Sequence, residues 1–313
     1  MILSIIIPCY NESESINFIY QRVNNVIKLE KIDYEIIFVN DGSRDNTIDN
    51  IKKVSNLDSK VKYISFSRNF GKESAMLAGL KYAEGECVVI MDGDLQHPPE
   101  LIPKMIKFYQ EGYDQVIAKR NRVGDNKYKT YMSRWYYKIV NSLIDVNLID
   151  GVGDFRLLSR PAVNALLSMN EYNRFSKGLF SWIGFKEKII EYENEARVAG
   201  ETKWSLKQLL QYGIEGIISF NNKPLRVCFG IGISLIGISL IYIMIMLFQI
   251  VFNGIDVPGY FTTIAAILII GGAQLIFTGV LGEYIGRIYY EVKRRPHFII
   301  NESNINSNDI YKK

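Results

Sequence analysis

The sequence predicts an α/β domain, built on a mostly parallel sheet with helices on both faces, followed by a hairpin of two membrane helices. Short apolar runs rich in β-branched residues alternate with segments of helical periodicity in the N-terminal part. Further on, residues 227–252 and 257–282 contain no Asp, Glu, Lys, Arg or His. Each of these two stretches exceeds the ~20 residues that span a bilayer. The 313 residues suffice for one full domain and this appendage.

Five short apolar runs are predicted as strands, and most are followed by a polar loop. They cover residues 2–7, 34–39, 61–66, 88–91 and 115–118. Helical periodicity follows the first run over 13–29 and the third over 73–83. Alternation of strands and helices favours parallel strands joined by crossover helices, which cover both faces of the sheet.

The segments beyond the fifth run are less regular. Residues 128–143 form an aromatic and basic helical stretch, and residues 150–156 a Gly-rich polar turn. Residues 205–220 carry apolar side chains at helical spacing, which suits either a helix in the membrane interface or one packed on the domain. The final residues, 301–313, are rich in Asn, Ser and charge and are expected to be disordered.

Basic residues flank the two membrane stretches on one side only. They are Lys223, Arg226, Arg287, Lys293, Arg294 and Arg295, and the connection 253–256 has none. The positive-inside rule therefore places both termini in the cytoplasm, and the N-terminus shows no signal peptide. Residues 1–204 are expected to form the cytosolic domain, 205–226 an amphipathic helix and linker, 227–286 the two membrane helices and 287–313 a basic cytosolic tail.

Composition limits the partners of the chain. The net charge of +4 gives no indication of nucleic-acid binding, and basic residues beside the membrane stretches suit anionic lipid headgroups. Cys9, Cys87 and Cys228 are widely spaced, which fits free thiols in a reducing compartment better than disulfides or a metal cluster.

Two carboxylates follow the fourth apolar run and mark the candidate site. Asp92 and Asp94 are one residue apart at the expected end of a buried strand, where open α/β sheets bind ligands. Carboxylate oxygens, with the amide oxygen of Gln96, suit Mg²⁺ or Mn²⁺ bound to a diphosphate. The alternative is that one of these aspartates only caps the next helix.

Further acids follow the first two strands, at Glu12 and Asp41. They could accept hydrogen bonds from the base or ribose of a nucleotide, and a divalent ion would offset the repulsion between the acids and a diphosphate. The first strand is not followed by a Gly-rich phosphate loop, which argues against a kinase or a dehydrogenase.

These segments resemble successive motifs of family-two GT-A glycosyltransferases. The matching segments are 8–12 (PCYNE), 39–43 (VNDGS) and 92–100 (DGDLQHPPE). The last segment is most similar to the polyprenyl-phosphate branch, which includes dolichyl-phosphate mannose synthase and the bactoprenol glucosyl transferases with two C-terminal membrane helices. The resemblance covers residues 1–295 and implies a GT-A fold.

The resemblance implies roles for individual residues. The donor site would comprise Pro8, Tyr10, Asn11, Glu12, Val39, Asp41, Asp92, Gly93, Arg197 and Lys203. The metal ligands would be Asp92, Asp94 and Gln96.

Residues later in the chain also match the family, and with Asp92 and Asp94 they would form the catalytic set. Arg120 and Arg134 would bind the donor and acceptor phosphates, and Arg197 and Lys203 belong to a loop that closes over the donor diphosphate. Asp154 would lie near the acceptor. The alternatives are that the two arginines are solvated charges and that Asp154 is a turn residue.

The resemblance implies an enzyme of the cell envelope, held in the plasma membrane with its catalytic domain in the cytoplasm. It would move a hexose from a nucleotide diphosphate sugar, with UDP-glucose as first choice, to undecaprenyl or another polyprenyl phosphate, with inversion at C1. UDP-N-acetylglucosamine, GDP-mannose and an amino-arabinose donor are the alternatives. The product would need a separate flippase and a downstream glycosyltransferase, and a homo-oligomer is expected.

Two other functions compete with this one. A processive polysaccharide synthase shares the acidic motif but carries Gln-x-x-Arg-Trp, and here Tyr131 stands at the Gln position before Arg134 and Trp135. A non-catalytic membrane scaffold that binds nucleotide sugars would not need the complete metal set together with Arg197 and Lys203.

Overall fold

The computed structural model describes most of the chain. The described residues are 2–30, 32–94, 96–121, 141, 146, 149–192, 223–253 and 259–305. The expected helix at 205–220 and most of the aromatic stretch at 128–143 therefore lie outside the described residues. The same holds for three of the expected site residues, Arg134, Arg197 and Lys203.

An eight-stranded sheet forms the centre of the domain, in the order β7-β5-β6-β4-β1-β2-β3-β8. Its strands are β1 (Ile2–Cys9), β2 (Asp33–Asn40), β3 (Val61–Phe66), β4 (Cys87–Ile90), β5 (Gln115–Arg120), β6 (Val152–Ser159), β7 (Glu187–Tyr192) and β8 (Ile300–Ser303). All five strands expected from the sequence are present. The strands β6, β7 and β8 were not expected.

The centre of the sheet is parallel, as predicted: β1 pairs with β2 and with β4, and β2 pairs with β3. The sheet as a whole is mixed, because β6 runs antiparallel between β4 and β5, and β8 runs antiparallel to β3. Of the four central strands, β1, β2 and β4 are almost fully buried and β3 is half-buried at Lys62 and Tyr63, which is typical of a sheet covered on both faces.

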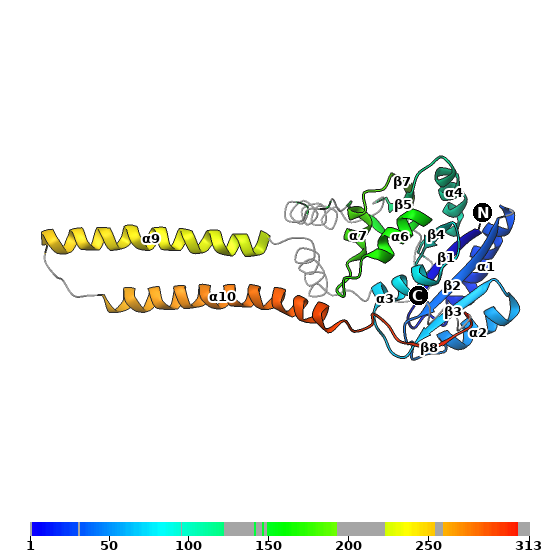
Figure 1. The fold of residues 1–313 in the computed structure, drawn as a ribbon, viewed down its shortest axis with the longest axis horizontal. Coiled ribbons are helices and arrows are strands. Elements are labelled where there is room, and N and C mark those ends of the chain that lie inside the picture. The colour runs from blue at the N-terminus through cyan, green and yellow to red at the C-terminus, as the bar shows by residue number, and fades with distance from the viewer. Residues whose placement is uncertain are drawn as a thin grey trace.

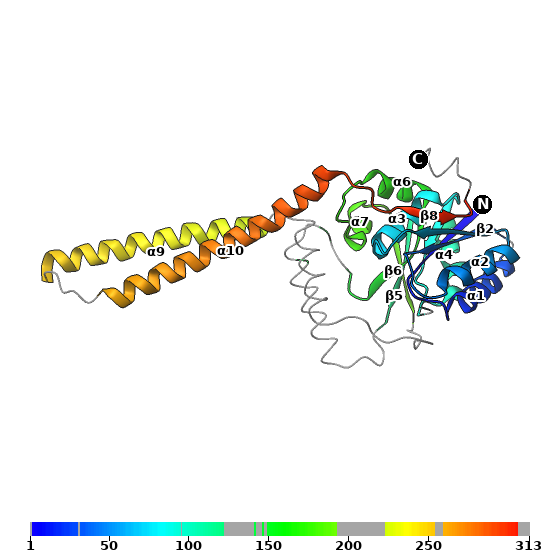
Figure 2. The same ribbon diagram turned by 90° about the horizontal axis from the view of Figure 1, so that it is seen from below.

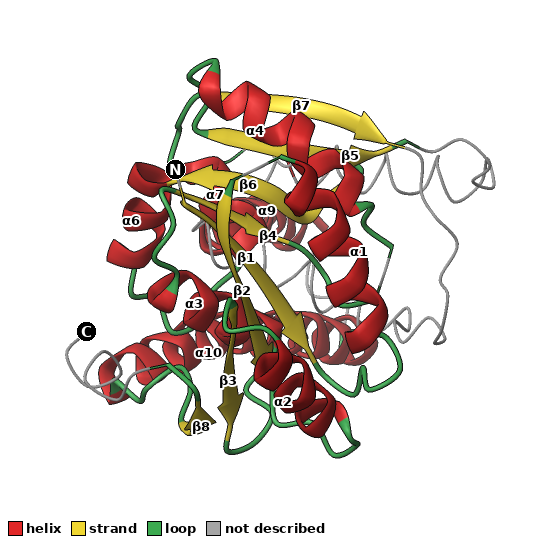
Figure 3. Cartoon of the chain, turned by 90° about the vertical axis from the view of Figure 1, so that its right-hand side faces the viewer, coloured by secondary structure: helices red, strands yellow, loops and turns green. Residues whose placement is uncertain are grey.

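Helices cover both faces of the sheet (Figure 3). One face packs against α1 (Ile16–Leu29), α2 (Thr47–Leu57) and α4 (Ile102–Gln110), which begins after the short helix η1 (Pro99–Leu101). The other face packs against α3 (Lys72–Tyr82), α6 (Arg160–Ser168) and α7 (Ser176–Trp182). This layered arrangement confirms the predicted fold class.

The two predicted apolar helices are present as α9 (Lys223–Asn253) and α10 (Tyr260–Lys293). The two helices lie side by side and project away from the domain (Figure 1 and Figure 2). Each contains a stretch apolar and long enough to cross a membrane, Leu225–Tyr242 and Ile269–Lys293, and neither stretch is buried within the chain. The alternative of a hairpin buried in a soluble core is therefore wrong.

The expectation of a disordered tail is wrong for its first residues. After α10 the chain returns to the domain and adds β8 to the edge of the sheet beside β3. The side chain of Asn304 accepts a hydrogen bond from the Tyr63 N–H at 2.6 Å and donates one to the Val61 carbonyl at 3.0 Å. Composition misled here, because these polar side chains replace apolar contacts by pairing with an exposed strand edge.

The prediction of a turn at 150–156 also needs correction. The turn is confined to the start of that segment, where Gly151 has a φ of +81°, and β6 begins at Val152. Because β6 is antiparallel to β4, its beginning lies beside the end of β4. This topology brings Asp154 to the edge of the sheet that carries Asp92.

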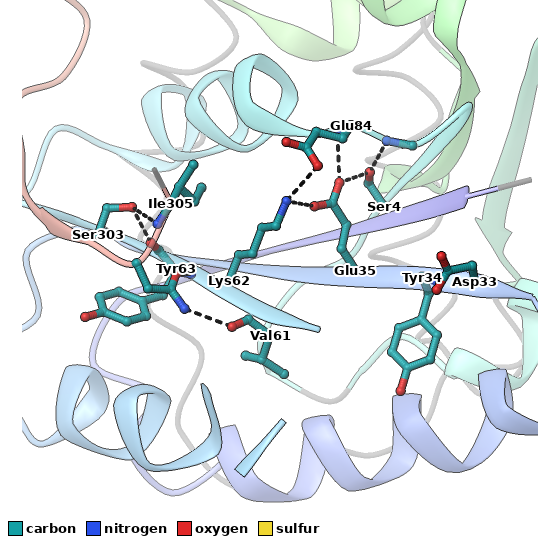
Figure 4. Close-up of polar contacts among 12 residues, drawn as sticks. Ser4, Asp33, Tyr34, Glu35, Val61, Lys62, Tyr63, Glu84, Ser303 and Ile305 are labelled. Carbon is teal, nitrogen blue, oxygen red and sulfur yellow. Dashed lines mark hydrogen bonds and ion pairs between the residues drawn. The ribbon is translucent and has the colours of Figure 1, made fainter. Parts of the chain in front are cut away.

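A charge cluster near the beginnings of β1 and β2 has a structural role (Figure 4). Glu35 is buried and accepts hydrogen bonds from the Ser4 hydroxyl at 2.5 Å and the Glu84 N–H at 2.7 Å. The ammonium group of Lys62 lies 2.8 Å from both Glu35 and Glu84. The carboxylate of Glu35 is thus paired and hydrogen-bonded, as a buried charge requires.

Candidate active site

The candidate site lies at the carboxyl ends of β4, β1 and β2, three neighbouring parallel strands. Pro8 and Val39 are paired across β1 and β2 just before these ends. The loops that follow the three strands carry Glu12, Asp41 and Asp92. The strand order therefore gathers the sequence-predicted residues along one edge, as expected for an open α/β sheet.

The loops after β1 and β2 are joined by hydrogen bonds. Asn11 has a left-handed backbone with a φ of +54°, its N–H donates to the Ser43 hydroxyl at 3.0 Å, and its side-chain oxygen accepts from the Arg44 N–H at 2.9 Å. Asn tolerates this conformation better than most residues. Asn11 thus fixes one loop against the other.

The same two loops are joined again one turn further on. The Glu12 N–H donates to the Thr47 hydroxyl at 2.9 Å, and the Ser13 N–H donates to Asp45 at 3.2 Å. Asp45 also accepts from Thr47. Tyr10, between these contacts and β1, is 36% exposed and available to a ligand.

Asp41 is more buried than its expected role suggests. Asp41 is only 3% exposed. Its two carboxylate oxygens accept hydrogen bonds from the N–H groups of Phe70 and Gly71, at 2.7 and 3.0 Å. Burial raises the pKa of this carboxyl, and the two N–H donors oppose the rise. The structure therefore shows Asp41 holding the loop between β3 and α3.

Gly42 allows that loop to approach. It has a φ of +62°, and a Cβ atom on it would lie 2.3 Å from the carbonyl carbon of Arg68. Only glycine avoids both the strain and the clash. The loops after β2 and β3 are therefore in direct backbone contact beside Asp41.

The Asp92–Asp94 turn is fixed by its neighbours. The Asp92 N–H donates to Nδ1 of His97 at 3.2 Å, and the His97 ring stacks on Phe155 with centroids 5.0 Å apart. A Cβ atom on Gly93 would lie 3.2 Å from the Cys9 sulfur, so the turn passes close to the end of β1. Asp94 accepts the N–H of Gln96 at 3.2 Å.

Lys72 connects two of the predicted carboxylates. Its ammonium nitrogen lies 2.6 Å from an oxygen of Asp92 and 2.6 Å from an oxygen of Asp154. Burial opposes the charge of Lys72, but attraction to the two carboxylates outweighs it and raises the pKa of the ammonium group. Burial likewise opposes the charge of Asp154, yet Lys72 and Lys177 together hold the pKa of that carboxyl well below its usual range.

Glu73 lies behind this ion pair. Its carboxylate accepts hydrogen bonds from the N–H and the hydroxyl of Ser176, at the beginning of α7. Burial, together with repulsion from Asp154, raises the pKa of Glu73 to about 7. At neutral pH this carboxyl is therefore partly protonated, unlike that of Asp154.

Arg120 belongs to the same edge. It ends β5, where it pairs with Tyr192 of β7. Burial raises the pKa of Tyr192 to about 12, Arg120 lowers it, and the negative charges of Asp92 and Asp94 raise it further. The phenol is thus within electrostatic range of both Arg120 and the acidic turn.

The residues present fit a divalent cation of the Mg²⁺ type. Among the described residues no group of three His, Cys, Asp or Glu side chains could hold a metal by itself. Mg²⁺ is commonly bound through one or two carboxylates while substrate phosphates and water complete its ligands. The hard carboxylate oxygens of Asp92 and Asp94 match such a site. The side chain of Asp92 is 26% exposed, so a ligand can reach it.

Sequence reasoning missed Lys72, Glu73 and Ser176. The sequence did contain a pattern that could have indicated Lys72 as a site residue, because it is the first residue of α3 and directly follows Gly71 in a polar loop after β3. That loop is the fourth at this edge, and a basic residue in it could have been considered beside Asp92. Asp154 was expected in the site, but its pairing with Lys72 could not be inferred, because the strand that carries Asp154 was taken for a turn.

Comparison with known families adds two matches. Residues 4–167 match the family described as glycosyl transferase family 2, and residues 223–288 match the one described as GtrB C-terminal hairpin. The first match covers the described loops after β1, β2 and β4 and the strand β6. The second covers α9 and most of α10.

Individual relatives match nearly the whole chain. The Bacillus subtilis (strain 168) chain CsbB, named only as a candidate glycosyltransferase, is 55% identical over 99% of this chain and 94% of its own length. The bactoprenol glucosyl transferase of Shigella phage SfII is 43% identical over 97% of this chain and 98% of its own. Among solved structures, mannosyl-3-phosphoglycerate synthase from Rubrobacter xylanophilus matches with a TM-score of 0.48 and 15% identity, over 69% of this chain and 71% of that chain.

Proposed function

Because this chain belongs to glycosyl transferase family 2 and carries the GtrB C-terminal hairpin, it is a glycosyltransferase, and we propose that it transfers glucose from UDP-glucose to polyprenyl phosphate. The transfer takes place at the cytoplasmic face of the membrane. The phage relative named bactoprenol glucosyl transferase supports the choice of sugar and of lipid. UDP-N-acetylglucosamine and GDP-mannose are the alternative donors.

One observation carries the proposal: the acidic turn at Asp92, the ion pair that joins it to Asp154, and the joined loops after β1 and β2 lie along a single edge of the sheet. In this arrangement the loops at Asn11 and Asp41 bind the nucleotide. The diphosphate lies toward the Asp92–Asp94 turn, and the sugar lies beside the bridge that Lys72 forms between Asp92 and Asp154.

The reaction we propose is one displacement with inversion at C1 of the sugar. A phosphate monoester has a second pKa near ~6 and is mostly dianionic at neutral pH, so the acceptor needs no strong base. Its oxygen forms the new bond to C1 while the bond from C1 to the diphosphate oxygen breaks, and the nucleoside diphosphate leaves. Positioning two anionic phosphates in line is the main task of the protein.

The residues of the chain divide this task. Lys72 keeps Asp92 and Asp154 at a fixed separation, and Asp154 orients a sugar hydroxyl or the acceptor. Arg120, with Arg134 and Lys203 outside the described residues, offsets the charge of the phosphates. Asp94, Gln96 and Asp92 hold a Mg²⁺ or Mn²⁺ ion, which neutralises the diphosphate when bound.

The hairpin brings this site to its lipid substrate. The strand β8 follows α10 in sequence yet pairs with β3 of the N-terminal domain, which supports a topology with both ends of the hairpin on one side of the membrane. The basic residues at those ends favour the cytoplasmic side. The plasma membrane is the expected location, and an oligomer, a flippase and a downstream glycosyltransferase remain proposed partners.

The proposal is tested with the full-length protein in nanodiscs that contain undecaprenyl phosphate. Labelled UDP-glucose, UDP-N-acetylglucosamine and GDP-mannose are supplied in turn, and the label in an organic-solvent extract is counted. We expect label from UDP-glucose, in a β-linked product if the α-linked donor is used. Asp94→Asn should lose this transfer, whereas Asp49→Asn, on an exposed position of α2, should retain it.

Other results would exclude the proposal in different ways. Donor binding without any labelled lipid would favour a scaffold, and a product that grows to many sugars would favour a processive synthase. A retained anomeric configuration would exclude the single displacement. Transfer from another donor alone would keep the reaction and change the sugar.

A further inference from the structure

A pocket lies away from the candidate active site, where the end of α10 meets the catalytic domain. It has a volume of about 550 Å³. Its lining residues come from the segment before α7 and from the end of α10 and the residues after it: Asn170, Tyr172, Tyr290, Glu291, Arg294, Arg295 and His297. The function proposed above does not use this pocket.

The walls of this pocket are fixed by contacts between the two parts of the chain. Tyr172 of the domain stacks on Tyr290 of α10, with ring centroids 5.4 Å apart and planes within 6°. His297 stacks on Tyr172 with centroids 5.8 Å apart. The Tyr172 N–H donates to Oε1 of Glu291 at 2.7 Å. The pocket therefore has a defined shape and is not a gap between loosely packed segments.

The lining carries more positive than negative charge. Arg294 and Arg295 both line the pocket, and Glu291 is the only acid among the lining residues that the structure describes. Burial, followed by repulsion from Arg174, lowers the pKa of His297, so its ring is a neutral hydrogen-bonding group at pH 7. Two guanidinium groups beside aromatic rings form a suitable site for a phosphate group, because each can donate two parallel hydrogen bonds to it.

The pocket lies at the expected level of the lipid headgroups. In the last turns of α10 the side chains of Ile285, Ile288 and Val292 are 63%, 61% and 74% exposed. Spacings of three and four residues place them on one side of the helix. An apolar stripe of this kind is compatible with hydrocarbon and ends beside Glu291. Tyr290 lies beside the end of this stripe and Arg294 and Arg295 follow it, at the position where tyrosines and cations meet a membrane surface.

We propose that this pocket binds the phosphate headgroup of an anionic phospholipid, which thereby joins α10 to the catalytic domain. The phosphate lies between Arg294 and Arg295, and the acyl chains follow the stripe that ends at Val292. A bound lipid holds Tyr172 of the domain against Tyr290 of the hairpin. It thus sets the height of the active site above the bilayer. The inference rests on the membrane association of the hairpin and not on the identity of the sugar donor.

The test measures lipid retention in the absence of any sugar nucleotide. Full-length protein is purified from nanodiscs of phosphatidylglycerol and phosphatidylcholine, and retained lipid is counted by native mass spectrometry. We expect one phosphatidylglycerol per chain, with retention reduced at least tenfold in Arg294→Gln/Arg295→Gln. The matched control Arg226→Gln/Lys293→Gln removes two charges near the start of α9 and at the end of α10, from residues that are not among those lining the pocket, and should retain the lipid.

A free-phosphate arm separates the two sources of the ligand. Inorganic phosphate and glycerol phosphate at millimolar concentration are added to protein stripped of lipid. Tight binding of either one, with no preference for phosphatidylglycerol, would overturn the lipid assignment. Equal loss of lipid in both double variants would also overturn it, because that result indicates general charge attraction. If the pocket variant aggregates, Arg295→Gln with Lys293→Gln as its match supplies the same comparison.

Discussion

Lys72 and Asp154 form an ion pair, with 2.6 Å between the ammonium nitrogen and a carboxylate oxygen. The side chain of Asp154 is only 12% exposed. The two residues come from opposite directions in the sheet: Lys72 begins α3 after the parallel strand β3, and Asp154 belongs to the antiparallel strand β6. The same ammonium group holds Asp92. Lys72 is therefore the residue that fixes the acidic turn relative to Asp154.

Replacing Lys72 by Met is expected to reduce turnover by about 100-fold, because it releases both carboxylates from their positions. The control Lys81→Met, at the other end of α3, should leave turnover unchanged. In a double-mutant cycle for the free energy of unfolding, Asp154→Asn should recover part of the stability lost in Lys72→Met, since it removes the buried charge left unpaired. Strictly additive effects would contradict the ion pair.

Removal of divalent cations is expected to abolish transfer, and added Mg²⁺ or Mn²⁺ should restore it, because the phosphates and the acids at Asp92 and Asp94 repel one another without a cation. Asp94→Asn should also weaken Mn²⁺ binding, measured by electron paramagnetic resonance with UDP present. Asp49→Asn serves as the control with the same change of charge. Full activity in chelator would contradict the assignment of the acidic turn.

The raised pKa of Glu73 predicts that the stability of the folded protein depends on pH. Its pKa is about 7 in the folded protein against an ordinary value of 4.5, so the folded state binds more protons than the unfolded state between these values. The free energy of unfolding should therefore fall as pH rises across this window, by no more than about 3 kcal/mol from this residue. Glu73→Gln should flatten this slope in thermal unfolding, and Glu111→Gln, in an exposed turn, should not.

Because the chain returns to the domain after α10 and pairs with β3, changes in this C-terminal segment are expected to affect the active site. Phe298 stacks on Phe66 at the end of β3, with ring centroids 5.0 Å apart and planes within 11°. Phe66 in turn packs edge-on against Phe70, whose N–H donates to Asp41. Phe298→Ala should destabilise the domain by about 2 kcal/mol and raise the KM for the sugar nucleotide.

A matched control for that variant is Phe18→Ala, because Phe18 is a phenylalanine of α1 that is 61% exposed. Its unfolding midpoint and KM should stay close to those of the unaltered protein. Chain truncated before Phe298 should lose stability further, since β8 is then absent. Unchanged donor affinity in Phe298→Ala would show that the tail has no influence on the loop at Asp41.

The sequence by itself determined the class of fold, the four central parallel strands, the acidic turn at 92–94 and the two apolar helices. These features depend on local patterns: buried parallel strands are continuous apolar runs, and a membrane helix is a long stretch without charge. The resemblance of 92–100 to a known motif pointed to the family for the same reason, because one short segment carries it.

Only the tertiary structure decided the features that depend on distant segments. Strand β6 looked like a turn because its first residues are Gly-rich and polar, and β8 looked disordered because its residues pair with β3 through polar side chains. Lys72 joins Asp92 to Asp154 because α3 begins at this edge of the sheet and the antiparallel strand β6 brings Asp154 to the same edge. Pairing between segments far apart in sequence leaves no local pattern, so only the folded chain reveals that Lys72, Asp92 and Asp154 meet.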